Sequence, residues 1–481
     1  MNVSLDYGVL APVLIPALGA VLILLIDAVV PRLGQWHWAI TAGILLVGAA
    51  ACVPGFVSDN DARTTLCLKG SQCLYVADRV ATTLQVATLV TAAVVALLVL
   101  PVPSPRERTP VAASLVLTAA AGGAGVAAAR DLGSWLVLIE LATVPTVALV
   151  AFGARRSAVD GALSLLTTSL VSFAILALGA AMWFAATGSA LLDGDAVLTA
   201  AADPDTKRVL VLSVVLIVAG LGFKLSLVPF HAWTPEAYAG ASIPIGAFLA
   251  VTSKLAALGA LLVVLRGITV LGAPALTAIG IVAAISMTLG NVMALRENST
   301  LRLLAWSTVA QAGWVILPLA TVASDAVRAA AGYLVVYGLA TLVAFAVVTQ
   351  VAHAEGRDHA TRLSSYAGLF RRRPLSAVAL ALSLLTLAGL PPGVLGLVAK
   401  VLALRPVAAD GLWWLAVVAA INAMLGVAVY LRWLLSLLGH SPREGVVERP
   451  HPVHSTLVIL GLVALAVTSL APQLLLGLAG R

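Results

Sequence analysis

The chain has 481 residues, of which 61% are hydrophobic and only 10% are charged. A water-soluble protein of this length needs more polar surface to cover its core, so the composition excludes an ordinary soluble enzyme. The formal net charge is +7, but the basic residues lie in short stretches between apolar runs. They therefore indicate orientation in a membrane rather than binding to nucleic acid.

Apolar runs of about 20 residues recur along the whole chain, and each is long enough to cross about 30 Å of hydrocarbon. Runs of this length without period-two alternation predict α-helices rather than barrel strands. We therefore expect an all-α polytopic membrane protein with about fourteen transmembrane helices. Their approximate ranges are 8–30, 37–57, 79–101, 110–129, 132–153, 161–187, 208–230, 243–265, 272–294, 302–321, 327–352, 375–404, 411–437 and 454–478.

The distribution of charge predicts how the chain is oriented. Asp6 precedes the first segment, which is longer than a secretory signal, so we expect a retained helix. Lys and Arg are more frequent in the loops after odd-numbered segments, for example in the run 371–373. The positive-inside rule then predicts that these loops are cytoplasmic and that both termini are outside. An acidic stretch between Asp193 and Asp205 would lie outside, in agreement.

Two predicted segments contain helix-breaking residues. The seventh has Pro229 near its end, and the twelfth has Pro391 and Pro392 between Gly389 and Gly393. Proline cannot donate a backbone hydrogen bond and clashes with the preceding turn of a helix. Broken helices at matching positions are typical of internal repeats in transport proteins.

The spacing of the two breaks predicts two five-helix units, the second inverted relative to the first because five is odd. The first unit would cover about 110–265 and the second about 272–437. The range 1–109 would hold three N-terminal helices, and 438–481 a loop and the last helix. No stretch has the length or composition of a separate soluble domain.

Ionisable residues inside the predicted segments are candidates for function. A charge at the bilayer centre costs roughly 2.5–3.5 kcal/mol on insertion scales, so such residues commonly face protein or water and mark ion pathways. We expect interface anchoring for Asp27 and Arg432, which lie near segment ends. The other four lie deeper or on the broken segments: Glu140, Lys224, Lys254 and Lys400.

These four residues permit proton relay. Burial penalises an ammonium ion, and a nearby carboxylate stabilises it. Movement of Glu140 towards or away from Lys224 would therefore switch this lysine between holding and releasing a proton. Backbone groups freed at the breaks would bind water that carries protons. The alternative is a structural ion pair or a hydrated pocket. His231, directly after the first break, is either a proton relay or a hydrogen-bond partner for freed carbonyls.

The stretches around these residues carry a family resemblance. They read GFKLSLVPFHAWTPEAYAGASIPIGAFLAVTSK at 222–254, RENSTLRLLAWSTVAQAGW at 296–314 and LAGLPPGVLGLVAK at 387–400. They resemble the antiporter-like membrane subunits of NADH-quinone oxidoreductase (respiratory complex I), over about 110–437. The resemblance implies that Glu140, Lys224, Lys254 and Lys400 form a proton path in a translocating complex of the bacterial cell membrane.

The resemblance also implies partners and cofactors. NADH, FMN, the iron–sulfur clusters and the quinone would belong to partner subunits, and this chain would bind none of them. The expected partners are M-type and L-type antiporter-like subunits, small membrane subunits and the lipid bilayer. Lys400 argues against the M-type, which has glutamate there. Lys254, the length and the absence of a long lateral helix favour the N-type.

Two other readings stay open from the sequence. One is the D-type subunit of a multi-subunit cation/proton antiporter, which has similar lysines and a similar length. The other is a membrane scaffold with inert ion pairs. The sequence also departs from the family at Gln311, where histidine is usual. Glutamine can conduct hydrogen bonds but does not titrate. Trp306 replaces a tyrosine, and Ser242 replaces a common proline.

The three cysteines indicate no metal site, because neither a CxxC pair nor a histidine-rich spacing is present. Cys52 lies in the second segment, where packing is its expected role. Cys67 and Cys73 lie in a connection predicted to be outside, a compartment that permits disulfides. A Cys67–Cys73 bridge and two free thiols are both compatible with this pattern.

Overall fold

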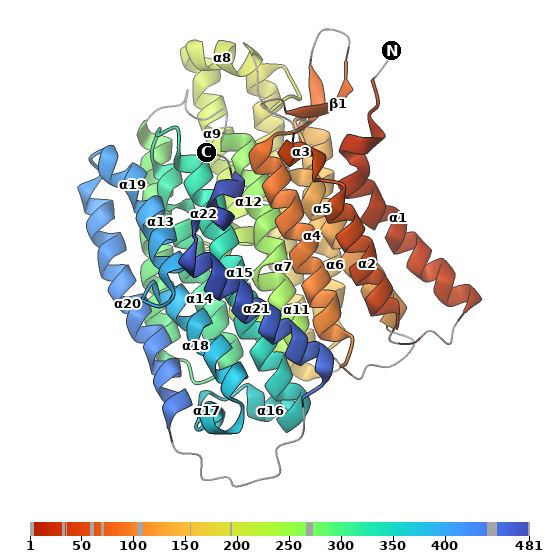
Figure 1. Ribbon diagram of the computed structural model, residues 1–481. Coiled ribbons are helices and arrows are strands. Elements are labelled where there is room, and N and C mark those ends of the chain that lie inside the picture. Colours follow the sequence, from red (N-terminus) through yellow and green to blue (C-terminus); the bar gives the residue numbers. More distant parts are fainter. Residues whose placement is uncertain are drawn as a thin grey trace.

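The computed structural model is a bundle of long helices (Figure 1). It describes residues 4–30, 34, 36–57, 62–68, 72–102, 109–153, 155–192, 195–265, 273–439 and 450–479.

The helices up to residue 265 are α1 (Tyr7–Val29), α2 (Trp36–Ala50), α3 (Pro54–Val57), α4 (Arg79–Val99), α5 (Thr109–Val126), α6 (Leu132–Ala151), α7 (Arg156–Thr187), α8 (Asp195–Ala202), α9 (Pro204–Leu225), α10 (Trp233–Gly240), α11 (Ile243–Ala250) and α12 (Thr252–Leu265). The later α-helices are α13 (Ala273–Arg296), α14 (Thr300–Ile316), α15 (Ala326–Glu355), α16 (Arg357–Ala360), α17 (Leu369–Arg372), α18 (Pro374–Ala388), α19 (Val394–Ala409), α20 (Trp413–Leu438), α21 (Pro452–Leu470) and α22 (Gln473–Leu476). Short 3-10 turns are η4 (Leu317–Ala320), η5 (Leu363–Tyr366) and η6 (Gly477–Ala479).

The predicted fold class is confirmed. Thirteen helices in the described ranges are long and apolar enough to cross a membrane. The predicted twelfth segment is divided into α18 and α19, so neither half reaches that criterion alone. The molecule is therefore an all-α, multi-pass membrane protein with an additional broken crossing.

Side-chain caps explain where several helices begin. The carboxylates of Asp6, Asp78, Asp131 and Asp203 accept hydrogen bonds from the first-turn N–H groups of α1, α4, α6 and α9. Ser299 does the same for α14. These first-turn N–H groups have no partner within the helix, so a capping oxygen stabilises the helix start at that residue.

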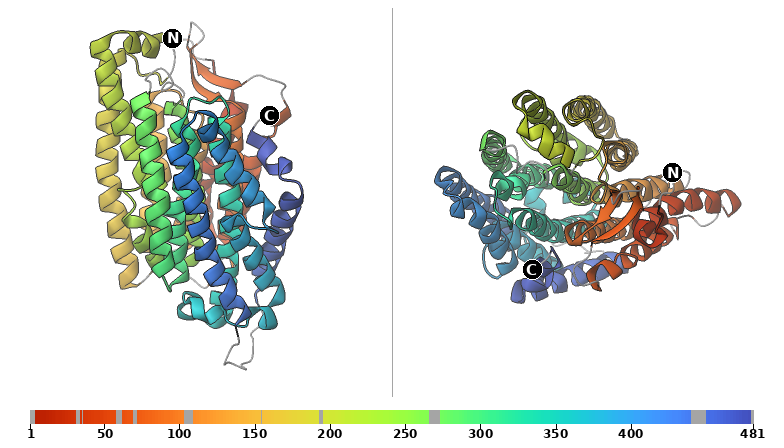
Figure 2. Two further views of the ribbon diagram at one scale, coloured as in Figure 1. Left: turned by 90° about the vertical axis from the view of Figure 1, so that its left-hand side faces the viewer. Right: turned by 90° about the horizontal axis from the view of Figure 1, so that it is seen from above.

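Small residues allow the helices to pack closely. A Cβ on Gly179 of α7 would lie 2.8 Å from Ile217 of α9, and one on Gly220 of α9 would lie 2.5 Å from Leu176 of α7. In lipid, such small residues bring two backbones together and stabilise helix association. The most deeply buried span is α14 with η4, and peripheral helices such as α21 surround the centre (Figure 2).

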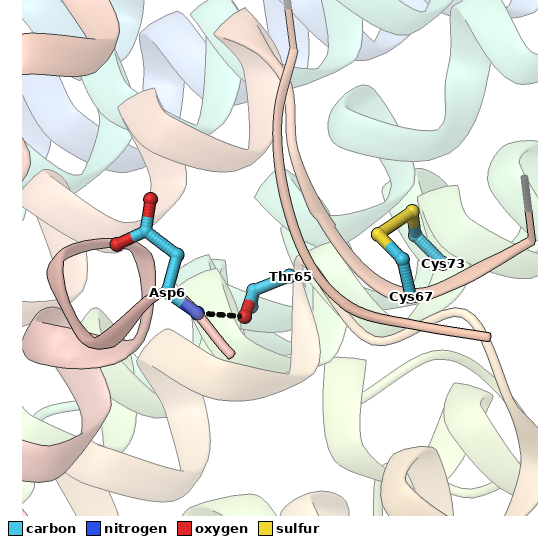
Figure 3. Close-up of a disulfide and its surroundings, with 4 residues drawn as sticks. All are labelled: Asp6, Thr65, Cys67 and Cys73. Atoms are coloured by element: carbon cyan, nitrogen blue, oxygen red, sulfur yellow. Dashed lines mark hydrogen bonds between the residues drawn. A yellow bond between two sulfur atoms is a disulfide. The ribbon is translucent and has the colours of Figure 1, made fainter. Parts of the chain in front are cut away.

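The predicted loop 58–78 contains a β-hairpin. Strands β1 (Arg63–Cys67) and β2 (Cys73–Ala77) are antiparallel, with Cys67 opposite Cys73. These two cysteines form a disulfide, and the Asp6 N–H donates to Thr65 Oγ1 at 2.8 Å (Figure 3). The disulfide links the two strands of the hairpin, and the hydrogen bond joins β1 to the start of α1.

Other predicted connections also contain structure. The range 188–207 includes α8, and 353–374 includes α16, η5 and α17. Most of the predicted connection 438–453 lies outside the described residues. The hairpin and both termini lie at one end of the bundle, whereas α16 and α17 lie at the opposite end (Figure 1).

Candidate functional site

The predicted break in the seventh segment begins four residues before Pro229. Helix α9 ends at Leu225, and Ser226 adopts a left-handed backbone with φ of 65°. The Leu227 N–H then donates back to the Gly222 carbonyl at 2.7 Å. A left-handed residue followed by a hydrogen bond back to the last turn is a common helix end, and proline often comes shortly after it because proline cannot continue the helix.

Lys224, in the last turn of α9, meets the predicted carboxylate. Its Nζ lies 3.0 Å from Glu140 Oε1 and 2.5 Å from Thr143 Oγ1, both on α6. The Lys224 side chain is 6% exposed and that of Glu140 is 22% exposed. Because Glu140 and Thr143 are three residues apart, they share one helix face. The structure thus forms a mostly buried ion pair with an additional hydroxyl partner.

Lys254 contacts the break itself. Its Nζ donates to the Lys224 carbonyl and to Ser226 Oγ, at 2.7 Å each. It also lies 4.5 Å from the centroid of the Trp233 ring. The C-terminal carbonyls of a helix carry partial negative charge and have no partner within the helix, so a buried ammonium is stabilised there. Lys224 therefore connects two charged groups: its side chain binds Glu140, and its backbone carbonyl binds Lys254.

Lys400 has a similar position at the second break. Helix α18 ends at Ala388, Gly389 is left-handed, and α19 begins at Val394, after Pro391 and Pro392. Lys400 Nζ donates to the Ala388 carbonyl at 2.6 Å. It lies 5.5 Å from the centroid of the Trp314 ring. Thus Lys254 and Lys400 each bind a carbonyl freed where a helix is interrupted.

A hydrogen-bonded cluster of aromatic hydroxyls lies around Gln311. The Tyr333 hydroxyl donates to Gln311 Oε1 at 2.6 Å, and Gln311 Nε2 donates to the Tyr430 hydroxyl at 2.9 Å and to the Leu387 carbonyl at 3.4 Å. Ser307 Oγ lies 2.6 Å from the Tyr430 hydroxyl. Leu387 is one residue before the carbonyl that binds Lys400, so this cluster reaches the second break.

His231 lies in the first break and does not join the lysines through any contact of the described residues. Its ring lies 5.3 Å from that of Trp306, and its Nδ1 has no hydrogen-bond partner. Proton relay and hydrogen bonding to freed carbonyls both stay predictions for His231.

Three cavities accompany the charged residues. One of about 20 Å³ is lined by Lys224, Thr143 and Thr146, and one of about 10 Å³ by Gln311 and Tyr333. These volumes match about one water molecule each. A third cavity, here called the vestibule, has a volume of about 550 Å³ and lies between the start of α15, the end of α19 and α22. Its lining comprises Ser324, Asp325, Arg328, Ala329, Gly332, Tyr333, Ala399, Leu402, Arg405, Pro406, Ala409 and Leu476.

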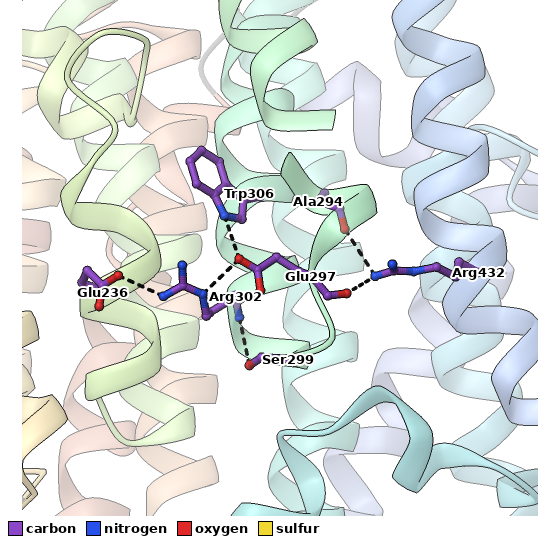
Figure 4. Close-up of polar contacts among 7 residues, drawn as sticks. All are labelled: Glu236, Ala294, Glu297, Ser299, Arg302, Trp306 and Arg432. Carbon is purple, nitrogen blue, oxygen red and sulfur yellow. Dashed lines mark hydrogen bonds and ion pairs between the residues drawn. The ribbon is translucent and has the colours of Figure 1, made fainter. Parts of the chain in front are cut away.

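The interface role of Arg432 stays a prediction. Its guanidinium donates to the backbone carbonyls of Ala294, Leu295 and Glu297 at the end of α13 (Figure 4). Carbonyl groups at the C-terminal end of a helix carry partial negative charge, so the Arg432 guanidinium on α20 is stabilised there. Asp27 Oδ1 lies 3.5 Å from His37 Nε2, which links α1 to α2.

A second charged cluster was missed from the sequence. Arg302 of α14 binds Glu236 of α10 at 2.9 Å and Glu297 at 3.0 Å (Figure 4). Arg357 donates to the carbonyls of Ala239 and Ala241 at the end of α10. Burial lowers the pKa of Arg357 to about 10, so it stays charged near neutrality. These contacts hold α10, the second half of the broken helix. The charged stretch RENSTLR was the signal available in the sequence.

Two interrupted helices, each with a freed carbonyl that binds a buried lysine, define a polytopic membrane protein with the antiporter-like fold. The family of NADH:quinone oxidoreductase and Mrp antiporter transmembrane proteins matches residues 129–426, and the chain belongs to this family.

Relatives and solved structures agree with this assignment. NADH-quinone oxidoreductase subunit N 2 of Streptomyces griseus is 37% identical over 92% of this chain and 84% of its own. Subunit N of Salinispora tropica is 36% identical over 99% of both chains. A chain of respiratory complex I from Thermus thermophilus has a TM-score of 0.82 and 29% identity, covering 98% of this chain and 100% of its own. The Mrp complex from Dietzia sp. contains a chain with a TM-score of 0.84, 20% identity and coverage of 98% and 96%, which shows the shared fold.

Proposed function

We propose that this chain is the N-type membrane subunit of a proton-translocating NADH-quinone oxidoreductase. The observation that carries the proposal is the connection from Glu140 through Lys224 to Lys254, made by one ion pair and one backbone carbonyl. The extensive similarity to subunit N relatives supports the identity of the complex.

In this proposal, Glu140 controls the proton on Lys224. At 3.0 Å and an effective dielectric of about 20, their attraction is roughly 5.5 kcal/mol, and at about 7 Å it falls to roughly 2.4 kcal/mol. Rotation of Glu140 away from Lys224 therefore makes the protonated lysine less favourable by about 3 kcal/mol. Lys224 then releases its proton to water in the adjacent cavity.

Lys254 and Lys400 continue the path in this proposal. Lys254 donates hydrogen bonds to the Ser226 hydroxyl and to the Lys224 carbonyl. A change in the charge of Lys254 therefore changes the electrostatic potential at Lys224. The hydroxyl cluster at Gln311 lies within the second proposed five-helix unit, 272–437, next to the second break. Because Tyr333 lines both that cluster and the vestibule, the vestibule is the proposed release route.

The proposal places all redox chemistry in partner subunits. NADH, FMN, the iron–sulfur clusters and the quinone would bind there, and M-type, L-type and small membrane subunits would adjoin this chain. The bacterial cell membrane is the proposed location. The termini and the hairpin would face outside, and the end with α16 and α17 would face the cytoplasm, as the basic loops indicate.

Purification of a tagged chain in mild detergent tests the proposal. We expect a large assembly with bound flavin, iron–sulfur absorption and quinone-dependent NADH oxidation. A colourless assembly without NADH oxidation would contradict it and would favour the D-type subunit of a cation/proton antiporter. Exchange of Na⁺ or K⁺ for protons by that assembly would then establish the antiporter.

A further inference from the structure

Three histidines gather at the end of the bundle where α16 and α17 lie, away from the lysines. His353 is in the last turn of α15, and His451 and His454 are at the start of α21. The His353 ring lies 5.3 Å from that of His454 and 5.8 Å from that of His451, and the last two are 6.1 Å apart. This histidine cluster has no part in the path described above.

Exposure falls from one histidine to the next. His353 is exposed, His451 is partly buried, and His454 is fully buried. His454 Nε2 lies 3.0 Å from the Leu98 carbonyl oxygen, and a carbonyl only accepts, so Nε2 carries the hydrogen. Nδ1 is then the basic nitrogen, and it is buried without a hydrogen-bond partner. A buried acceptor without a hydrogen bond destabilises the folded state. A proton or a water molecule that reaches Nδ1 during function removes this penalty.

Buried polar side chains lie next to the histidine cluster. Gln350, one helical turn before His353, is 2% exposed. Its Oε1 accepts from Ser376 Oγ of α18 at 2.5 Å, and its Nε2 donates to Ser455 Oγ at 3.2 Å. Ser455 directly follows His454. The helices α15, α18 and α21 pack against one another, so these groups form a polar core within a three-helix contact.

The polar side chains continue along α18 towards the second break. Ser383 lies two turns after Ser376 and donates to the Ala340 carbonyl of α15, and Thr386 follows one turn later. Two residues beyond Thr386, the Ala388 carbonyl binds Lys400. Ser376 and Ser383 are about 10 Å apart along the helix axis, a distance that a short chain of water molecules spans.

We propose that the histidine cluster collects protons at this end of the bundle and passes them along the α15–α18 contact to Lys400. This intake route rests on the proposed function and on the cytoplasmic assignment of this end. Imidazole exchanges protons near neutrality because its ordinary pKa is about 6.5. A proton captured at His353 or His451 moves to Nδ1 of His454, whose Nε2–H stays on Leu98.

The charged groups near the histidine cluster form ion pairs with one another. Glu355, two residues after His353, binds Arg372 and His359 at 2.9 Å each, and Arg373 lies 3.8 Å from it. On α4 the facing group is the Leu98 carbonyl, and on α18 it is Ser376. The histidines are therefore the titrating groups of the described residues that line the start of this route.

The test uses inside-out vesicles that contain the complete complex, with its cytoplasmic face outward. The variants are His454→Ala, Lys400→Met and the control His37→Ala, which removes another buried histidine that lies outside the route. Proton translocation is recorded as acidification of the vesicle lumen between pH 6.5 and 8.5, with and without added imidazole. Assembly is checked by NADH oxidation with an artificial electron acceptor.

We expect His454→Ala to translocate protons roughly tenfold more slowly at pH 8.5, less so at pH 6.5, and to recover with imidazole. His37→Ala should equal the parent at every pH. Normal translocation by His454→Ala, or a loss that imidazole does not restore, would overturn the intake route. If Lys400→Met is inactive while His454→Ala is normal, the proposed function stands without this route. If Lys400→Met is also normal, the proposed proton path through Lys400 fails as well.

Discussion

At the scale of single residues, Lys224 uses its side chain and its backbone for different partners. Deep charges are rare in membrane helices, so the sequence alone identified Glu140, Lys224, Lys254 and Lys400 as candidates. The sequence also suggested that Glu140 approaches Lys224, but the carbonyl contacts of Lys254 and Lys400 could not be predicted, because they depend on where each helix ends. Ser226, a left-handed residue other than glycine three residues before Pro229, ends α9, and this frees the carbonyl that Lys254 binds.

The Ser226 hydroxyl provides a residue-scale prediction. Ser226→Gly keeps the left-handed backbone without strain and removes one of the two hydrogen-bond acceptors of Lys254. The lost hydrogen bond involves a charged group and is worth about 1.5–3 kcal/mol. We expect proton translocation in vesicles to slow by roughly tenfold or more.

The matched control is Ser213→Ala, which removes a buried hydroxyl of the same helix that donates to Gly179. It should translocate protons at the parental rate. Equal rates for Ser226→Gly and the parent would show that Lys254 does not need this partner.

At the scale of helices, the apolar segments were predicted closely, because about 20 consecutive apolar residues have few alternatives in lipid. The interruption between α11 and α12 at Val251 was missed, since neither proline nor glycine lies there. The hairpin in 58–78 and helix α8 were missed for another reason. They lie outside the apolar segments, where hydropathy carries no information on secondary structure.

The second break depends on a close approach of its two halves. A Cβ on Gly396 of α19 would lie 1.7 Å from the Thr386 carbonyl oxygen of α18. Gly396→Ala should therefore separate α18 from α19, displace Lys400 and lower the thermal stability of the purified complex by several degrees. Gly43→Ala on α2 meets no atom within 4 Å and should leave the melting temperature unchanged. A similar melting temperature for both variants would contradict the observed packing.

The two carboxylates that bind Arg302 should differ in their effect on stability. Glu236 is 52% exposed, whereas Glu297 is 16% exposed and also accepts from the Trp306 indole. Exposed ion pairs contribute about 0–1 kcal/mol, and buried partners cost more to remove. Glu297→Gln should therefore lower the melting temperature more than Glu236→Gln. The reverse order would show that Glu236 holds α10 in place.

At the scale of the whole molecule, composition and charge predicted a multi-pass membrane protein and one orientation for it. The structure places the hairpin and both termini at the same end, but which side of the membrane that end faces remains a prediction. The Cys67–Cys73 disulfide offers a direct way to test the orientation.

In intact cells, a thiol reagent that does not cross membranes should label Cys67 and Cys73 only after reduction. The buried Cys52 is the control and should stay unlabelled without denaturation. Labelling of Cys67 and Cys73 without reduction would contradict the disulfide. Labelling restricted to inside-out vesicles would place the hairpin in the cytoplasm and reverse the orientation.

The central claim is that protons cross this chain through the Glu140–Lys224 pair. The most direct test measures acidification of the lumen of inside-out vesicles during NADH oxidation, with complexes that carry Lys224→Met or Glu140→Gln. Lys207→Met is the control, because Lys207 lies in the first turn of the same helix, far along the chain from the break. We predict that the first two variants assemble and lose most proton translocation, whereas Lys207→Met equals the parent. Parental rates of translocation in both Lys224→Met and Glu140→Gln would contradict a proton path through this pair.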